Sequence, residues 1–219
     1  MARQDPIRNT YEEFPDELKG TLQQAEKEQG QTPRSTTSRK VLIQNHDWHL
    51  KFLTEGVLPP RSLILPPPYP PSRTPTPKAQ QIHIEDLRIG SRISNQLLIV
   101  RTVAEPYVYS STVTIAEDED GHAARLTICN WEDMMNEPTI PKGTILAIKQ
   151  PCWSEVPGGG YHIRVDHPSD LDLCSAETVV VPAAWRHGTS TAQGRDAALW
   201  KEEGNMLFLK KQFRRALQS

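Results

Sequence analysis

Five short runs of β-branched and aromatic residues constrain the fold of this chain of 219 residues more than any other feature. Such residues suit the pleated, half-buried surface of a β-sheet, and several of the runs alternate apolar with polar positions. The runs are Gln96–Val103, Tyr107–Ile115, Ala124–Cys129, Thr144–Lys149 and Tyr161–Val165. The sequence therefore predicts a small five-stranded β-structure within residues 81–173.

The links between these runs indicate how the strands are connected. Asp120-Gly121 follows the second run, and Asp-Gly between two alternating runs is typical of a tight hairpin turn. A loop or short helix over residues 132–137 follows the third run. Three strands, a short helical link and two more strands are the order of an OB-fold, a small Greek-key barrel. An SH3-like barrel or a short sandwich would leave a similar pattern.

The charge of this central block bears on what it can bind. Residues 81–173 carry 7 Lys and Arg against 14 Asp and Glu, a net charge of −7. Affinity for nucleic acid comes largely from cations, so this balance argues against such a ligand. The block's aromatic side chains could stack on bases, but core or interface positions are favoured. They are Tyr107, Tyr109, Trp131, Trp153 and Tyr161.

Two groups of residues could be considered as metal-binding sites, and neither has a sufficient set of ligands. If Gly121 were the turn glycine of an EF-hand loop, Ala116 and Thr127 would occupy two ligand positions, and neither can bind calcium there. The acidic run that ends at Asp120 is therefore expected to be a solvated hairpin tip. His46 and His49 are spaced by three on a predicted helix, but two ligands are too few. Ordinary surface and edge positions are expected for both histidines.

The neighbouring residues Asp166 and His167 could be considered as a catalytic pair, because a carboxylate can orient an imidazole. No nucleophile accompanies them, and adjacent residues on a strand point to opposite faces. A tight corner, in which Asp166 or Ser169 caps backbone amides, is the better interpretation. We therefore expect no catalytic residue, no metal ligand and no cofactor site in this chain.

The segments before the barrel are predicted from their composition and periodicity. Residues 1–40 are polar and are expected to be largely disordered, with one possible helix over Glu12–Gln29. Residues 41–58 form an amphipathic helix with Val41, Trp48 and Phe52 along one stripe. Residues 59–80 hold nine of the chain's 19 prolines and are expected to form a stiff connector that straps along a domain surface. Their PxxP spacing also matches segments that aromatic-lined sites recognise.

Apolar runs, the N-terminal sequence and the cysteines indicate in which cellular compartment the protein is expected. No run of 18 apolar residues is present, so no membrane span is expected. The N-terminus has no apolar signal core. Cys129, Cys152 and Cys174 are few and far apart, which suggests a reducing compartment. We expect an intracellular protein, cytoplasmic or nuclear.

The C-terminal residues show the spacing of one helical repeat. After a linker over residues 174–195, residues 196–219 place Trp200 four before Gly204, Leu207 three after it and Ala216 twelve after it. These spacings fit a tetratricopeptide repeat whose second helix is incomplete. Half a repeat cannot bury its apolar face, so this face is expected to contact a protein partner. The expected interaction residues are Trp200, Leu207, Phe208 and Phe213.

With these features in place, the chain resembles the N-terminal region of fungal proteins that combine tetratricopeptide repeats with a SET domain. The resemblance covers residues 82–219 and includes a weaker similarity at Tyr69-Pro70-Pro71. The matching segments are Glu117–Gly121, Ile148–Pro151, Gly160–Asp170, Trp185-Arg186 and Glu203–Asn205. In that family the SET domain would transfer methyl groups from S-adenosylmethionine to lysine, and no segment here matches its motifs. The resemblance therefore implies a front end without catalytic residues.

The sequence thus predicts an α+β protein: a five-stranded OB-like β-barrel, flanking helices and a C-terminal partial tetratricopeptide hairpin. The leading functional hypothesis is a scaffold module for protein–protein interaction that is not an enzyme. The first alternative is the substrate-positioning region of a SET-type lysine methyltransferase, and the second is single-stranded nucleic-acid binding by the barrel. A reading frame that continues past Ser219 into SET motifs would favour the first alternative.

Overall fold

A computed structural model describes most of the chain, and every structural statement below concerns the described residues. They are residues 16–34, 37–56, 68–73, 79–108, 111–131, 140–156, 160–174, 181–188, 201, 205–206 and 208–209. The predicted link over 132–137 lies outside them, as does most of the predicted C-terminal repeat.

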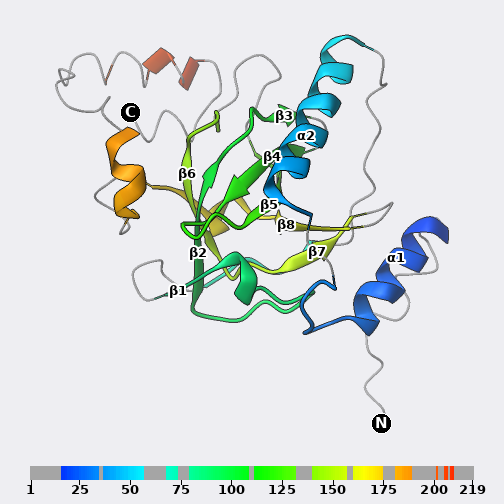
Figure 1. The fold of residues 1–219 in the computed structure, drawn as a ribbon. Coiled ribbons are helices and arrows are strands. Elements are labelled where there is room, and N and C mark those ends of the chain that lie inside the picture. Colours follow the sequence, from blue (N-terminus) through cyan, green and yellow to red (C-terminus); the bar gives the residue numbers. More distant parts are fainter. Residues whose placement is uncertain are drawn as a thin grey trace.

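The described residues are mostly β-sheet with few helices, and their strands form the OB-like barrel that the sequence predicts (Figure 1). Its five main strands follow the five predicted runs. These strands are β2 (Gln96–Thr102), β4 (Ser111–Glu117), β5 (Ala123–Cys129), β6 (Ile145–Lys149) and β8 (Tyr161–Val165). Shorter strands extend the sheet: β1 (Gln80–Ile82), β3 (Tyr107–Val108), β7 (Trp153–Glu155) and β9 (Leu171–Leu173).

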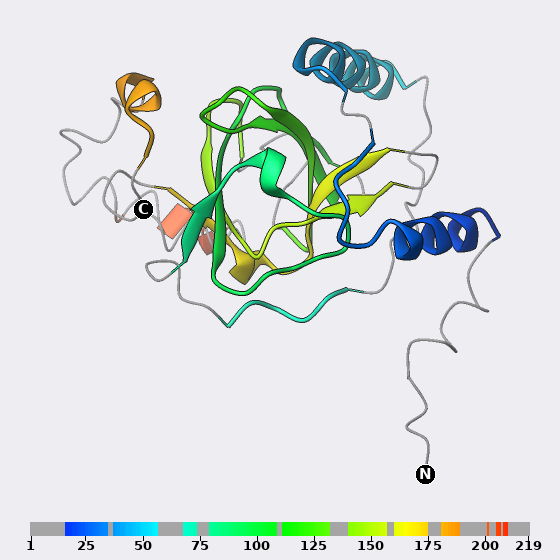
Figure 2. The same ribbon diagram turned by 60° about the horizontal axis from the view of Figure 1, so that its bottom comes forward.

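The pairing of these strands closes the sheet on itself. β2 pairs antiparallel with β4 and β6, β4 pairs antiparallel with β5, and β5 pairs parallel with β8. β7 pairs antiparallel with β8 and follows β6 directly in the chain, after a corner at Gln150 where φ is 49°. One bent stretch, β6–β7, therefore pairs with β2 at one side of the sheet and with β8 at the other, which is the strand order of an OB-fold. Figure 2 shows the resulting ring of strands.

The interior of the ring is filled by aliphatic side chains from every main strand. Leu98 and Val100 of β2, Leu126 and Ile128 of β5 and Ile163 of β8 belong to the same apolar cluster. All five are essentially inaccessible to solvent. Their burial supplies the main stabilisation of the barrel, at about 1.5–3 kcal/mol for each aliphatic side chain of this size.

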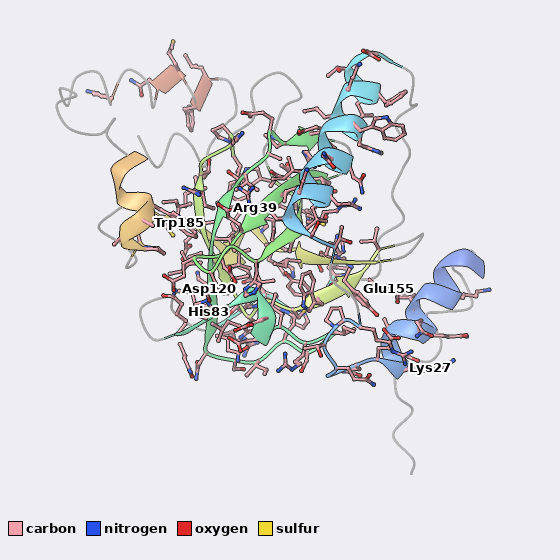
Figure 3. All side chains as sticks on the ribbon, in the orientation of Figure 1. Lys27, Arg39, His83, Asp120, Glu155 and Trp185 are labelled. Carbon is pink, nitrogen blue, oxygen red and sulfur yellow. The ribbon has the colours of Figure 1, made fainter. Side chains whose placement is uncertain are left out.

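Helix α2 (Arg39–Thr54) covers the outside of β4 and β5. Leu42 and Ile43 pack there against Val103, Ala104 and Ile115, which form a second apolar cluster. This cover explains why all seven residues of β4 are buried, although a barrel strand normally exposes alternate residues. The first residue of the helix, Arg39, is joined to the end of β4 by an ion pair with Glu117 (Figure 3).

The buried side of α2 differs from the predicted stripe. Val41 and Trp48 are exposed, the latter to 60%, and Trp48 instead stacks beside Phe52 on the same helix with ring centroids 4.3 Å apart. His46 was expected at a surface or edge position, and that prediction is wrong. Its imidazole is buried and stacks on Tyr107, with Nε2 2.7 Å from the carbonyl oxygen of Glu105.

The turn between β4 and β5 is longer than the predicted two-residue hairpin turn. The last strand pair is Glu117 with Ala123, and the amide of Asp118 donates to the carbonyl of His122. Only Gly121 within this loop has a positive φ, at 84°. A turn that ends in a glycine of this conformation is the usual three-residue hairpin connection. The Asp-Gly signal thus located the hairpin but not its loop length.

Two further segments pack on the barrel. The 3-10 helix η5 (Ala183–Gly188) brings Trp185 onto the outer face of β2 and β6, where Val181 joins the same cluster. Helix α1 (Asp16–Lys27) lies beside β7, and the turn after it exchanges backbone hydrogen bonds with Ile89 through Gly30 and Gln31. No helix in the described part of the chain is long and apolar enough to cross a membrane.

Candidate functional site

The acidic run Glu117–Asp120 lies at one end of the barrel, where the β4–β5 loop meets the 3-10 helix η3 (Ile84–Asp86). Its first two carboxylates serve the fold. Glu117 is buried and receives hydrogen bonds from Arg101 at 2.6 Å and from Arg39 at 2.5 Å. Burial raises the pKa of Glu117, but the two guanidinium partners outweigh it and hold that pKa below its usual range.

Asp118 fastens the loop to the helix η3. One of its carboxylate oxygens accepts the Ile84 amide at 2.9 Å, and the other accepts the His122 amide at 2.9 Å. The side chain is only 2% exposed. Because a buried carboxylate that loses such partners is costly, Asp118 fixes the position of the loop that follows it.

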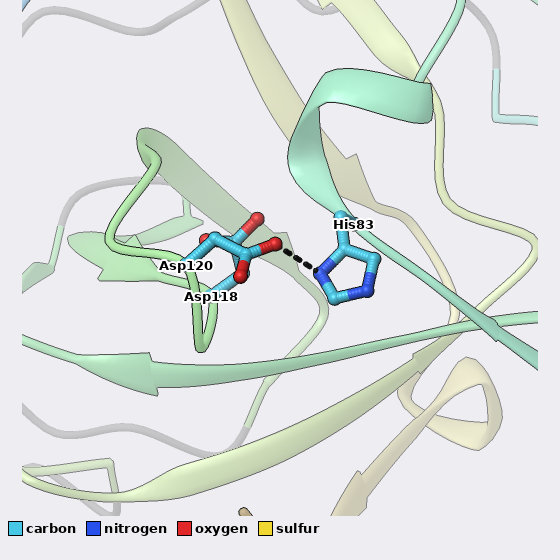
Figure 4. A group of neighbouring side chains, drawn as sticks. All are labelled: His83, Asp118 and Asp120. Atoms are coloured by element: carbon cyan, nitrogen blue, oxygen red, sulfur yellow. Dashed lines mark ion pairs between the residues drawn. The ribbon is translucent and has the colours of Figure 1, made fainter.

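The last two carboxylates of the run point outward. Asp120 forms an ion pair with Nδ1 of His83 at 2.9 Å (Figure 4). Glu119 lies 3.9 Å from Nε2 of the same ring. On the opposite side, Glu85 lies 4.0 Å from His122. Their side chains are 38% exposed for Glu119, 50% for Asp120 and 64% for Glu85. We call these three carboxylates the acidic tip.

One atom each of His83, Asp118 and Asp120 lies within 4.8 Å of the others, so the three could share a metal ion. An imidazole and two carboxylates are ligands that suit several divalent cations. Both oxygens of Asp118 already accept backbone amides, however, so a metal would compete with the hydrogen bonds that hold the loop. The acidic tip is better suited to ammonium and guanidinium groups, which need only the exposed oxygens.

At neutral pH the acidic tip is an anionic surface. Within the described residues, the ion-pair partners of Glu85, Glu119 and Asp120 are the imidazoles of His83 and His122. Two imidazoles thus face three carboxylates, so acidic groups outnumber basic ones at the tip. A cation that approaches this end of the barrel therefore meets three exposed carboxylates held by a fixed loop.

Sequence reasoning identified the acidic run but not its histidine neighbours. It assigned the run to a solvated hairpin tip, and Glu119 and Asp120 are indeed exposed. Strands β2 and β3 and most of β4 lie between His83 and the run in the sequence. His83 is close to the run only because η3 lies against the β4–β5 loop. No local pattern around His83 indicates this contact.

Asp166 and His167, for which a catalytic role was considered and rejected, have a structural role. Asp166 accepts the backbone amide of Tyr69 at 3.1 Å, and His167 contacts the carbonyl oxygen of the same residue. These two residues hold the proline-rich segment, as the tight-corner interpretation anticipated for a backbone-capping Asp166. Pro168–Asp170 then forms the short 3-10 helix η4.

The aromatic residues considered as stacking platforms mostly lie in packed positions. Trp153 is buried, Trp131 and Tyr161 pack against the barrel core, and Tyr107 lies under His46. Tyr109 is outside the described residues. The four described rings thus serve the core and the helix contact.

Of the four expected interaction residues near the C-terminus, only Phe208 is described. It lies on a helical residue and is 60% exposed. Trp200, Leu207 and Phe213 lie outside the described residues, so the partial hairpin stays a prediction.

Comparison with known proteins gives one distant relative. No family model matches the chain. Over 182 residues, 80% of this chain, it is 24% identical to a protein of the fungus Gibberella zeae named "Methyltransferase". The chain spans 23% of the length of that relative. Among solved structures, the OB domain of a Methanosarcina mazei protein is 18% identical with a TM-score of 0.33, and the match covers 47% of this chain and 90% of that domain.

The fungal relative overturns one sequence prediction. The chain itself was expected not to be an enzyme, because no catalytic motif could be recognised in it, although a full-length relative could be a SET-type lysine methyltransferase. A relative that is named as a methyltransferase contradicts that expectation and relates the chain, distantly, to a methyltransferase. The prediction failed because the absence of recognisable motifs says little about sequences that are this divergent.

Proposed function

We propose that this chain is a substrate-positioning region of a methyltransferase and that its acidic tip binds a segment rich in lysine and arginine. The similarity to the fungal methyltransferase over 182 residues carries the proposal. The finer assignment, a SET-type lysine methyltransferase with tetratricopeptide repeats, follows the resemblance of the segments around Gly160–Asp170 and Glu203–Asn205. A lysine-directed enzyme requires a surface that attracts basic segments.

The charge of the barrel supports a basic substrate. Residues 81–173 have a net charge of −7, and three of their exposed carboxylates gather in the acidic tip, which gives this end of the barrel a negative electrostatic field. Such a field raises the local concentration of a cationic ligand. The tip can therefore hold a basic segment without a deep pocket.

The expected affinity is modest. Exposed ion pairs contribute about 0.2–1 kcal/mol each, and salt weakens them because the screening length is about 8 Å at physiological ionic strength. Binding through three such carboxylates should be weak and strongly salt-dependent. A weak site is suitable for positioning, since a methylated product has to leave it.

The C-terminal residues support a repeat array in the proposed enzyme. Met206 and Leu209 expose 56% and 80% of their surface on helical residues. Stacking of a further helix would cover such apolar surface, as it does between tetratricopeptide repeats. We include Trp200, Leu207, Phe208 and Phe213 in that contact.

A peptide titration tests this function. A fluorescent peptide of alternating Lys, Arg and Gly, with a control peptide in which Gln replaces every cation, is titrated with the whole chain at low and physiological salt. We expect salt-sensitive binding of the basic peptide alone. Labelled S-adenosylmethionine in the same mixture reports whether the chain also transfers methyl groups. Absence of basic-peptide binding at low salt would contradict the positioning role.

A matched pair of variants then locates the binding. Glu119→Gln with Asp120→Asn removes two charges from the acidic tip, and Asp47→Asn with Glu55→Gln removes two from the exposed side of α2. The tip variant should bind the basic peptide at least fivefold more weakly, while the α2 variant should bind it like the unaltered chain. Equal losses in both variants would mean that general charge, and not the tip, attracts the peptide.

A further inference from the structure

The proline-rich segment Pro68–Arg73, which we call the strap, lies across residues near the C-terminal end of β8. Two buried carboxylates accept hydrogen bonds from its backbone amides. The Tyr69 amide donates to Asp166 at 3.1 Å, and the Ser72 amide donates to Asp170 at 2.8 Å. Pro70 and Pro71 have no amide hydrogen, so these are the only backbone donors between positions 69 and 72.

The spacing of these donors matches the geometry of an extended proline helix. Such a helix has three residues per turn, so Tyr69 and Ser72 present their amides on the same side, one turn apart. The acceptors on the barrel are Asp166, which precedes η4, and Asp170, which is the last residue of η4. Donors and acceptors are therefore paired in register.

The two carboxylates are held in place by cations. Arg164 donates to Asp166 at 2.5 Å, and Arg92 donates to Asp170 at 3.0 Å. Both carboxylates are essentially inaccessible to solvent. Buried carboxylates are costly unless paired and hydrogen-bonded, so these acceptors are preorganised for backbone amides of the strap.

The Tyr69 side chain adds specificity. The guanidinium of Arg92 lies over the Tyr69 ring, 3.5 Å from its centroid. Arg92 also donates a hydrogen bond to the Pro70 carbonyl at 2.7 Å. The Tyr69 hydroxyl donates to the Arg164 carbonyl at 3.1 Å and accepts the Asp166 amide at 2.9 Å. A phenylalanine would lose both of these hydrogen bonds, so the site favours tyrosine.

We propose that Arg92, Arg164, Asp166, His167 and Asp170 form a binding site for tyrosine-containing proline-rich peptides, filled in this chain by its own strap. We call these five residues the strap site. Their contacts depend on the amide positions, the tyrosine hydroxyl and the extended backbone, all of which a separate Tyr-Pro-Pro-Ser peptide also provides. A peptide from another molecule enters only when the strap leaves.

The strap normally outcompetes such a peptide. A segment tethered to its site acts at an effective concentration in the millimolar range, well above that of a free peptide in a cell. A substitution that weakens the contacts of the strap with the strap site removes this advantage. The acidic tip plays no part in these contacts, so the inference is independent of the proposed function.

A complementation experiment tests the strap site. The whole chain with Tyr69→Ala is titrated with a labelled peptide that copies residues 66–73, and binding is followed by fluorescence anisotropy. We expect this variant to bind the peptide at least tenfold more tightly than the unaltered chain does. A peptide with Ala in place of Tyr should not bind, and one with Phe should bind several-fold more weakly.

A second variant is tested in case Tyr69→Ala does not fold, and circular dichroism measures whether each variant is folded. Ser72→Pro removes one strap amide and keeps the tyrosine, so it should loosen the strap and also admit the peptide. Tighter peptide binding by either folded variant than by the unaltered chain supports the strap site. Binding that is equal in the unaltered chain and the folded variants, or absent from all of them, would overturn it.

Discussion

At the scale of single residues, buried polar groups determine most of the specific contacts in this protein. Asp118, Asp166 and Asp170 are buried carboxylates, and each accepts backbone amides from a segment distant in the sequence. Since an unpaired buried carboxylate is costly, each of them favours one arrangement of the segments it joins. Local periodicity cannot indicate such partners, which is why His83 and Tyr69 were not linked to their sites from the sequence.

His162 makes a residue-scale prediction about pH. Its ring is buried between β5 and β8, with Nδ1 2.7 Å from the Thr127 hydroxyl. Burial, with smaller contributions from Arg164 and Arg125, lowers the pKa of His162 from 6.5 to about 3. The unfolded chain therefore binds a proton at pH values where the folded chain does not, and stability should fall as the pH drops from 6.5 towards 3.

Urea unfolding at several pH values checks this expectation. The free energy of unfolding should decrease with falling pH below 6.5, and His162→Gln should make that slope shallower whatever its effect on absolute stability. Some slope should persist, because burial also lowers the pKa of His46. A slope that is unchanged in the variant would show that His162 is not held neutral in the fold.

At the scale of elements, the strands were predictable and the helix orientation was not. The five main strands follow local runs of β-branched residues, and their order alone indicates an OB-like barrel. The buried side of α2 depends on what lies beneath it. Leu42 packs on the barrel, but Val41 and Trp48 are exposed and the polar His46 is buried on Tyr107, so hydrophobicity alone gave only part of the buried face.

The contact between α2 and the barrel can be tested with two neighbouring residues. Ile43 packs on the cluster of Val103, Ala104 and Ile115, whereas Val41 is exposed to 42%. Ile43→Ala should lower the free energy of unfolding by about 1–2 kcal/mol, less than for a fully buried isoleucine because the side chain is partly accessible. Val41→Ala should change it by less than about 0.5 kcal/mol. Chemical denaturation followed by tryptophan fluorescence measures both, and similar values would place α2 away from the barrel.

At the scale of the whole molecule, the two proposed binding surfaces lie at separate places on the closed barrel. The acidic tip lies at the β4–β5 loop, and the strap site lies beside η4. Both lie mostly on loops and 3-10 helices that connect the strands, and the proposed function assigns the basic substrate to the tip alone. The two surfaces can therefore be distinguished by where a ligand perturbs the protein.

The most direct measurement is therefore a set of amide nitrogen–proton NMR spectra of the labelled chain, recorded while an unlabelled Lys- and Arg-rich peptide is added at low salt. If the tip positions basic substrates, the amide signals of Glu85, Gly121 and His122 should shift progressively and return with added salt, while those of Ser72 and Leu171 stay in place. Shifts that are confined to the strap region, or absent everywhere, would contradict the claim that the acidic tip of this barrel receives a basic substrate.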